Sequence, residues 1–272
     1  MVIGGKNFLN GGSGHGNISV HVRHERFSRL GETPEVSGPP REHPQATGQY
    51  SSRYVGRKGE EYFRYQSGMA EAAASLIIPK IEHLVSPDDD LLDFGCGSGE
   101  FLSRLPGRSK VGVDINEAAV AEARRRGFEV YRSLAEIPAE RQFDVALSNH
   151  CLEHVPYPIA ALREIRQRLR SGGWLILCLP IDDWRYQRHY DPEDINHHLH
   201  TWTPLLLGHT LTEAGFEVGS MRIVTQAWPR RLARWQARLP TALWDFLCFI
   251  GGVIRKRRSL LTVANKPAGE KE

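Results

Sequence analysis

Short apolar runs alternate with helical patterns along residues 86–181, and this alternation limits the possible folds more than any other feature. Helical stretches separate the runs, and one of them has Asn116 as its expected N-cap and ends at Gly127. The strand-like runs are 91–94, 110–113, 129–131, 143–147 and 174–179. Strand–helix units in series predict a parallel sheet covered on both faces, because right-handed crossovers place the helices there.

Further elements extend this sheet toward the C-terminus. After a polar loop at 182–200, a helix is expected with Thr203 as its cap and Pro204 at its first position. Apolar runs at 216–224 and 259–264 add two strands. We therefore expect an α/β fold: a doubly wound, seven-stranded, mostly parallel sheet with an antiparallel last strand, in a three-layer α-β-α sandwich.

Composition divides the chain into further segments. Residues 1–49 contain nine glycines and four prolines without a sustained apolar period, which predicts a disordered leader. An N-terminal helical segment follows at 50–85, expected as one broken helix or two shorter ones because Gly68 and Pro79 interrupt it. The α/β domain itself is predicted at 86–225 plus 259–266.

Residues 226–258 form a predicted basic and apolar helical insertion between the last two strands. Its apolar run, 242–254, contains one charged residue, Asp245, and lies between Arg-rich stretches. The run is too short to cross a bilayer, but it suits an interfacial helix whose cationic ends meet anionic headgroups. A cap over a substrate cleft, or a contact with a second subunit, remains open.

Cysteine usage and charge limit the compartment and the partners. The four cysteines are far apart without paired spacing, which disfavours a disulfide scaffold and a cysteine zinc site. With no secretion signal or spanning run, we expect a cytoplasmic protein, peripheral to the inner face of the membrane if the insertion binds lipid. The net charge of +3 is small, and the excess of basic residues is concentrated in the insertion, so no nucleic-acid partner is expected.

A glycine loop, Asp93-Phe94-Gly95-Cys96-Gly97-Ser98-Gly99, follows the first expected strand. In a doubly wound sheet, ligands bind at the carboxyl ends of strands, where glycines let the backbone approach them closely. The next strand ends at Asp114, whose carboxylate can accept hydrogen bonds from ribose hydroxyls. The glycine spacing differs from the dinucleotide fingerprint, which disfavours a nicotinamide oxidoreductase.

The ordered set of motifs resembles that of the class I S-adenosylmethionine-dependent methyltransferases, in the small-molecule branch that has Leu-Glu-His at 152–154. The matches cover roughly residues 54–224 and the last strand. The resemblance implies S-adenosylmethionine as the cofactor. It implies the following binding residues: Asp93, Gly95, Cys96, Gly97 and Gly99 for the methionine part, Asp114 for the ribose, Ile115, Ser133 and Leu134 for the adenine, and Ser148 and Asn149 beside the sulfonium.

Methyl transfer to a hydroxyl requires alignment and removal of a proton. His150, Glu153 and His154 are spaced to share one face of a helix, and His154 is the first candidate for the base. Quinone and small-RNA O-methyltransferases have Glu-x-x-Glu-His here, with a later histidine, and use a divalent cation. His150 replaces the first glutamate of that motif, which would shift a magnesium site toward zinc, manganese or iron. Leu-Glu-His is also common in this branch among proteins without a metal, so we expect no resident metal; a divalent cation and a packing role for His154 both stay open.

Substrate contacts are expected in the loop after the fifth strand, from Trp184, Tyr190, His198 and His200. Tyr54, Arg57 and Tyr62 of the leading helical segment can close over the cofactor. The leading hypothesis is methyl transfer to oxygen or nitrogen of a small-molecule acceptor, such as a sugar, a lipid-linked glycan or a quinone-like compound. The alternative is a non-catalytic cofactor-binding relative that acts as a regulatory or interaction module. No oligomeric state is predicted.

Overall fold

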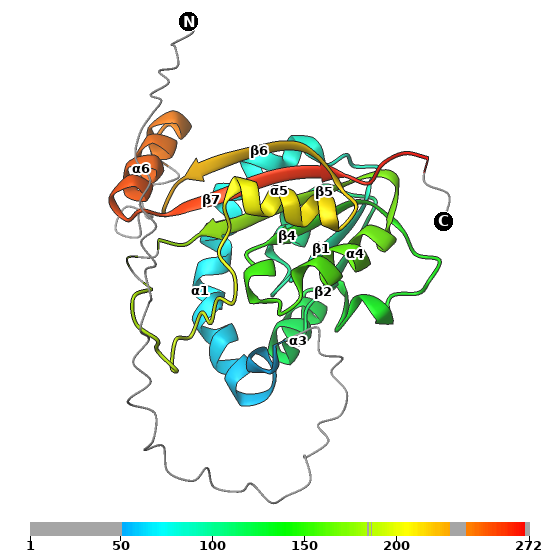
Figure 1. Ribbon diagram of the computed structural model, residues 1–272, viewed down its shortest axis with the longest axis horizontal. Helices are drawn as coiled ribbons and strands as arrows, with labels where there is room; N and C mark the ends of the chain where they lie inside the picture. The colour runs from blue at the N-terminus through cyan, green and yellow to red at the C-terminus, as the bar shows by residue number, and fades with distance from the viewer. Residues whose placement is uncertain (1–50, 184, 186, 229–237, 270–272) are drawn as a thin grey trace, which may run out of the picture. The chain divides into compact units, whose positions relative to one another are not determined.

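A seven-stranded sheet forms the centre of the fold (Figure 1). The computed structural model describes residues 51–183, 185, 187–228 and 238–269, so the predicted leader at 1–49, Trp184 and 229–237 of the insertion lie outside the described residues. The strands are β1 (Asp90–Phe94), β2 (Ser109–Val113), β3 (Glu129–Tyr131), β4 (Phe143–Asn149), β5 (Leu169–Ile181), β6 (Glu217–Thr225) and β7 (Arg258–Asn265).

The strand order is β3-β2-β1-β4-β5-β7-β6, and β7 runs antiparallel to both β5 and β6. The remaining pairs are parallel, which confirms the predicted fold class. Because β1, β2, β4 and β5 run in one direction, their carboxyl ends meet at one edge of the sheet. This edge, which ends β1 at Phe94 and β4 at Asn149, is called the carboxyl edge below.

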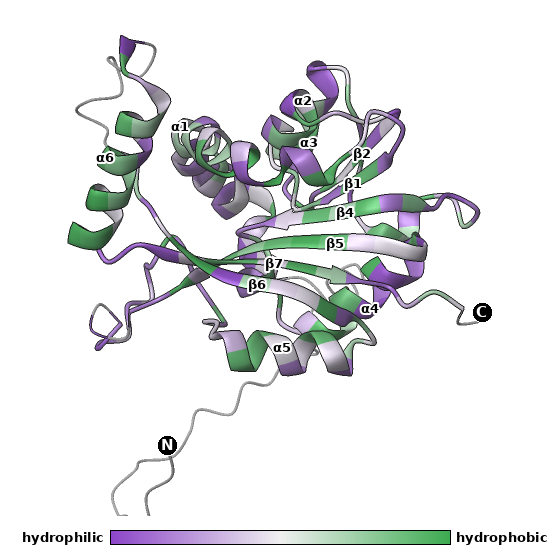
Figure 2. Cartoon of the chain, turned by 90° about the horizontal axis from the view of Figure 1, so that it is seen from above, coloured by the Kyte–Doolittle hydropathy of each residue, from purple (hydrophilic) through white to green (hydrophobic). Residues whose placement is uncertain are grey.

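Helices cover both faces of the sheet (Figure 2). Buried side chains of α1, α2 and α3 pack on one face, and those of α4 and α5 pack on the other. The helices are α1 (Gly56–Ile81), α2 (Glu100–Arg104), α3 (Glu117–Arg125), α4 (Pro158–Arg168), α5 (Pro204–Glu213) and α6 (Thr241–Ile254). Strands β1 and β4 are almost wholly buried because a parallel sheet is covered on both sides.

The expected caps are present. The side chain of Asn116 accepts hydrogen bonds from the first backbone N–H groups of α3, and Thr203 accepts one at the start of α5. The predicted break in the leading helix is wrong, because α1 continues through Gly68 and contains Pro79 in its last turn. A stripe of buried residues packs α1 on the sheet, and such packing outweighs a cost of about 1 kcal/mol for an internal glycine.

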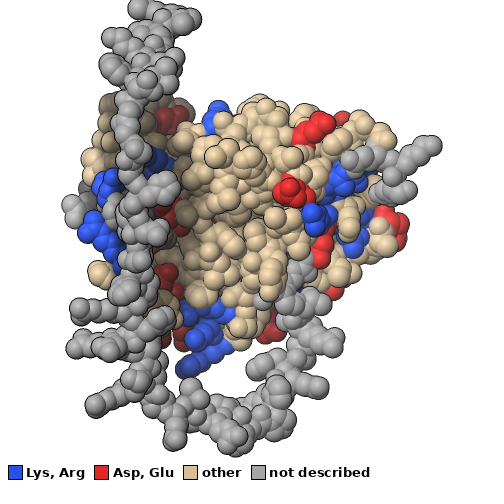
Figure 3. Space-filling model, viewed as in Figure 1, with Lys and Arg blue, Asp and Glu red and all other residues tan. Residues whose placement is uncertain are grey.

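Helix α6 lies beyond the ends of β5 and β6, on the side of the carboxyl edge (Figure 1). It is largely hydrophobic and is followed by a hydrophilic segment (Figure 2). Lys and Arg side chains form one group on the side of the molecule where α6 lies, and other groups lie at the lower edge and on the opposite side of the same view (Figure 3). Among the described residues, no helix combines the length and the hydrophobicity needed to cross a membrane.

Candidate active site

The glycine loop joins β1 to α2 at the carboxyl edge. Gly95, Gly97 and Gly99 all have positive φ, of 83°, 53° and 83°, a conformation that favours glycine. A side chain at Gly95 would collide with Cys151, since its Cβ would lie 2.5 Å from the sulfur. A Cβ at Gly97 would meet no atom within 4 Å, so this part of the loop faces open space where a ligand can approach the backbone.

Asp114 holds the loop from the end of β2. Its Oδ2 accepts a hydrogen bond from the Gly97 amide at 2.8 Å, and its Oδ1 accepts one from the Asn116 amide at 2.9 Å. Each oxygen keeps a second lone pair for a ribose hydroxyl. Burial raises the pKa of Asp114, although both amides oppose the shift. The side chain of Cys96 points away from this surface and is buried against Gly112.

Asp93 stands beneath the loop with an unsatisfied oxygen. Its side chain is buried, and its Oδ2 has no hydrogen-bond partner among the described residues. Burial, and then the neighbouring charge of Asp114, raise the pKa of Asp93 to about 8. A buried carboxylate without a partner is costly, so the site suits a cationic ligand. S-adenosylmethionine, which carries an ammonium and a sulfonium group, fits this requirement.

Further unsatisfied polar atoms lie at the end of β4, the strand next to β1. Ser148 Oγ and Asn149 Oδ1 are buried and lack partners within the described part of the chain. At the end of β2, Ile115 is half-buried. Ser133 is half-buried after β3, whereas Leu134 is buried in the hydrophobic core below it.

His150 and Glu153 come together in the segment after β4. His150 has a positive φ of 50°, which costs about 1–2 kcal/mol in a non-glycine residue. Its Nδ1 lies 3.5 Å from Oε1 of the fully buried Glu153. Desolvation works to lower the pKa of His150, but contacts with Cys178 and Glu153 outweigh it and raise the pKa. Burial alone would raise the pKa of Glu153; the His150 contact keeps it below its ordinary value.

His154 is held by two tyrosines from the leading helical segment. The Tyr54 hydroxyl donates to the Asn196 carbonyl at 2.7 Å and also lies 2.7 Å from His154 Nδ1. Nδ1–H therefore donates to Tyr54, and Nε2 accepts from the Tyr62 hydroxyl at 3.3 Å. Desolvation lowers the pKa of His154 to about 4. The ring is thus neutral near pH 7, with both nitrogens engaged. The expected helical face is not formed, since only a 3-10 turn at Leu152–His154 occurs here.

His198 reaches the same place from the loop after β5. Its Nδ1 lies 2.7 Å from Asp182 Oδ2, and this hydrogen bond outweighs desolvation and raises the pKa of His198. The end of this loop is held in place because the Leu199 and His200 amides both donate to the Glu153 carbonyl. His200 points elsewhere, with its Nε2 donating to the Val155 carbonyl at 3.0 Å.

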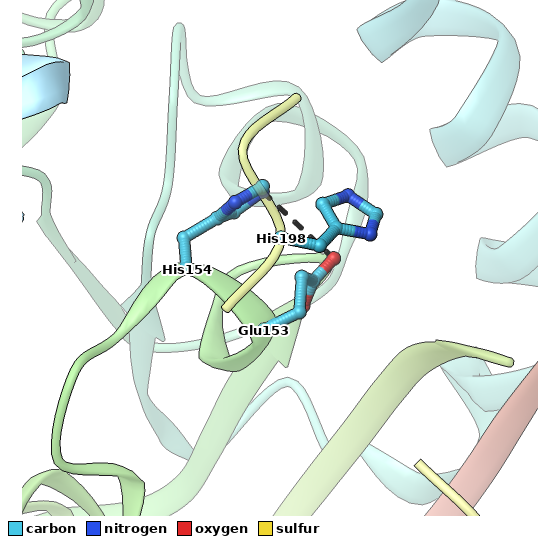
Figure 4. A group of neighbouring side chains, drawn as sticks. All are labelled: Glu153, His154 and His198. Atoms are coloured by element: carbon cyan, nitrogen blue, oxygen red, sulfur yellow. Dashed lines mark ion pairs between the residues drawn. The ribbon is translucent and has the colours of Figure 1, made fainter. Parts of the chain in front are cut away.

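Glu153, His154 and His198 form a compact group (Figure 4). One carboxylate oxygen and one nitrogen from each histidine lie within 4.8 Å of one another. Neither oxygen of Glu153 accepts a hydrogen bond of normal geometry among the residues that the structure describes, although Oε1 lies at ion-pair distance from His150 and His154, at 3.5 and 3.9 Å. This donor set can hold a divalent cation, of the kind that accepts mixed oxygen and imidazole ligands such as zinc, manganese or iron, only where the Tyr62 hydroxyl gives up Nε2 of His154. It can equally orient a substrate hydroxyl.

Another expected substrate residue, Tyr190, lies on the protein surface. Tyr190 is 91% exposed, and Trp184 lies outside the described residues. Asp182 was missing from the residues predicted as functional. Its position could have indicated a functional role, because Asp182 directly follows β5. Residues that follow the strands of a parallel sheet lie at its carboxyl edge, where ligands bind. Arg57 is exposed, unlike Tyr54.

This fold and loop define the class of Rossmann-like α/β domains that bind an adenosyl cofactor. Residues 64–220 match a family described as a methyltransferase domain, and the chain belongs to that family. S-adenosylmethionine is its cofactor. A ubiquinone biosynthesis O-methyltransferase of Ruegeria sp. is 41% identical over 103 residues, which cover 34% of this chain and 41% of that protein. The chain spans less than half the length of the curated relatives it matches first.

Solved structures show the same fold. An S-adenosylmethionine-dependent methyltransferase of Methanosarcina mazei has a TM-score of 0.51 at 20% identity, covering 70% of this chain and 98% of that one. Phosphoethanolamine N-methyltransferase 2 of Haemonchus contortus, solved with phosphomonomethylethanolamine and S-adenosylhomocysteine, has a TM-score of 0.53 at 15% identity. That match covers 78% of this chain and 60% of the other.

Proposed function

We propose that this protein transfers a methyl group from S-adenosylmethionine to a hydroxyl oxygen of a small, quinone-like acceptor. The observation that carries the proposal is the row of buried, unsatisfied oxygens at the carboxyl edge, on Asp93, Ser148, Asn149 and Glu153. Buried polar atoms are normally hydrogen-bonded, so such a row indicates a ligand site. The similarity to ubiquinone O-methyltransferases supports a hydroxyl as the acceptor group.

The donor end of the site is the glycine loop and its neighbours. Asp93 binds the ammonium of the methionine part, while the backbone at Gly95, Cys96, Gly97 and Gly99 encloses it. Asp114 binds the ribose. Ile115 and Ser133 would face the adenine, with Leu134 in the hydrophobic core behind them, and Ser148 and Asn149 would flank the sulfonium. When bound, the cofactor supplies an electrophilic methyl group.

The acceptor end is the group around Glu153. Nδ1 of His198 lies 2.7 Å from Asp182 Oδ2, so Nδ1–H donates to Asp182 and Nε2 keeps a lone pair that can accept a proton. His198 accepts the hydroxyl proton there as the acceptor oxygen bonds to the methyl carbon and the carbon–sulfur bond breaks. His150, Glu153 and His154 orient the acceptor. His154 is a positioning residue in this scheme, because Tyr54 and Tyr62 occupy both of its nitrogens.

Calorimetric titration with S-adenosylmethionine and S-adenosylhomocysteine tests the donor end. Binding to the full chain that Asp114→Ala abolishes would support it, and absence of binding by the wild type would refute it. Transfer of labelled methyl to catechols, sugars and amines then tests the acceptor. Cofactor binding without transfer to any acceptor would indicate a non-catalytic relative instead.

A chelator separates the two chemistries available to Glu153, His154 and His198. Because His198 and Asp182 form a complete proton acceptor, turnover should survive dialysis against EDTA. If turnover is lost in EDTA and restored by added zinc, manganese or magnesium, a bound cation and not His198 would activate the acceptor hydroxyl. Cofactor binding, which uses the glycine loop, serves as the control in both states.

A further inference from the structure

Helix α6 is apolar on two opposite sides, although only one of them packs on the domain. Trp244, Cys248 and Gly252 are spaced four apart and are buried on the inner side. The outer side carries large apolar side chains that are 37–74% exposed: Leu243, Phe246, Phe249, Ile250, Val253 and Ile254. A contiguous exposed apolar face of this kind marks an interaction surface. We call these six residues the α6 face.

Close contacts fix which side of α6 points outward. A Cβ at Gly252 would lie 2.5 Å from the Gln226 nitrogen, so the helix backbone lies directly against the end of β6. The Ala227 amide donates to the Cys248 carbonyl at 2.9 Å. The rings of Trp228 and Trp244 meet edge to face at 5.2 Å. The α6 face therefore cannot turn toward the domain without breaking these contacts.

Four basic residues follow α6, and the carboxylate of Asp183 lies close enough to Lys256 for their charges to interact. The four, Arg255, Lys256, Arg257 and Arg258, are all exposed. The one acidic residue of the helix, Asp245, lies close enough to Lys80 of α1 for their charges to interact. An apolar face beside a run of basic residues matches a bilayer surface, whose acyl chains lie beneath anionic headgroups.

We propose that the α6 face and the basic run at 255–258 dock the protein on an anionic lipid surface. With 14 residues, the helix is about 21 Å long, shorter than the ~30 Å hydrocarbon core, so it lies in the interface and does not span it. Since α6 lies on the side of the carboxyl edge, docking brings the methyl-donor site beside the lipid. This partner goes beyond the proposed transfer reaction and does not depend on it.

Co-sedimentation of the full chain with vesicles tests the proposal. The protein should pellet with phosphatidylcholine–phosphatidylglycerol vesicles, stay in solution with phosphatidylcholine alone, and be released by high salt. Phe246→Glu with Phe249→Glu should weaken binding at least tenfold, because charge on the apolar face opposes insertion. Arg257→Ala and Arg258→Ala should each weaken it about fivefold.

Leu205→Glu with Leu206→Glu is the matched control. These α5 side chains are 71% and 49% exposed but have no basic run beside them, so vesicle binding should not change. Unchanged S-adenosylmethionine affinity shows that each variant is folded, whether or not methyl transfer occurs. Equal binding to neutral vesicles would overturn the proposal. So would a lipid-free dimer that the Phe246 and Phe249 changes dissociate, since the α6 face would then bind a second copy.

Discussion

Asp93→Asn tests the electrostatics of the donor site. If the buried carboxyl binds the cofactor ammonium, Asp93 must lose its proton when S-adenosylmethionine binds. With a pKa raised to about 8 by burial and by Asp114, the carboxyl is mostly protonated at pH 6. Cofactor affinity should then fall about tenfold for each pH unit below 8, or about 100-fold at pH 6, equivalent to about 2.7 kcal/mol.

Calorimetric titration between about pH 5.5 and 7 measures this effect, below the range of about 7.7–8.0 in which a free α-amino group itself titrates. Repeating the titration in buffers of different ionisation enthalpy should show close to one proton released per cofactor bound. Asp93→Asn should bind more weakly near pH 8, with no proton release and a flat pH dependence. Asp88→Asn, an exposed carboxyl just before β1, should behave like the wild type.

The raised pKa of Asp93 also predicts how the stability of the unliganded protein depends on pH. Between about pH 4 and 8 the unfolded chain ionises Asp93 while the folded chain keeps it protonated, so folding stability falls as pH rises across this window. Asp93→Asn should therefore raise the midpoint of thermal unfolding at pH 8 and leave it nearly unchanged at pH 4.

The reasoning about cofactor binding would be refuted by a wild-type affinity for S-adenosylmethionine that stays constant from pH 5.5 to 7, without proton release.

Three further substitutions have matched controls or separable readouts. Gly97→Ala and Gly56→Ala both place alanine at a positive φ with open space around it, and each should lower folding stability by about 1 kcal/mol. Only Gly97→Ala should weaken cofactor binding, as measured by calorimetry. Tyr54→Phe removes a buried hydroxyl with three partners and should lower the free energy of unfolding by about 1–3 kcal/mol in urea titrations, whereas Tyr190→Phe, at a 91% exposed position, should not. Asp182→Asn should lower kcat by about 100-fold or more with cofactor affinity unchanged, and an unaltered kcat would remove the His–Asp pair from the mechanism.

The basic insertion shows how far pattern alone can go. The apolar run and its Arg-rich flanks predicted a helix near 242–254, and α6 is found there. Because nearly every position of α6 is hydrophobic, the sequence pattern could not predict which side of the helix packs inward. Gly251 and Gly252, which allow the backbone of residues 226–227 to approach, decide that orientation.

The sequence by itself determined the sheet, the helix caps and the glycine loop at Asp93–Gly99, because hydrophobic period, capping residues and glycine spacing are local signals. Only the tertiary structure decided which polar side chains meet. Tyr54 and His154 are 100 positions apart, and His198 lies in the group with Glu153 while His200 does not. The polar loop at 182–200 has no period of its own. Asp191 and Asp194 form local turns within it, but its last residues are held by hydrogen bonds to the distant Glu153 carbonyl, which no local pattern encodes.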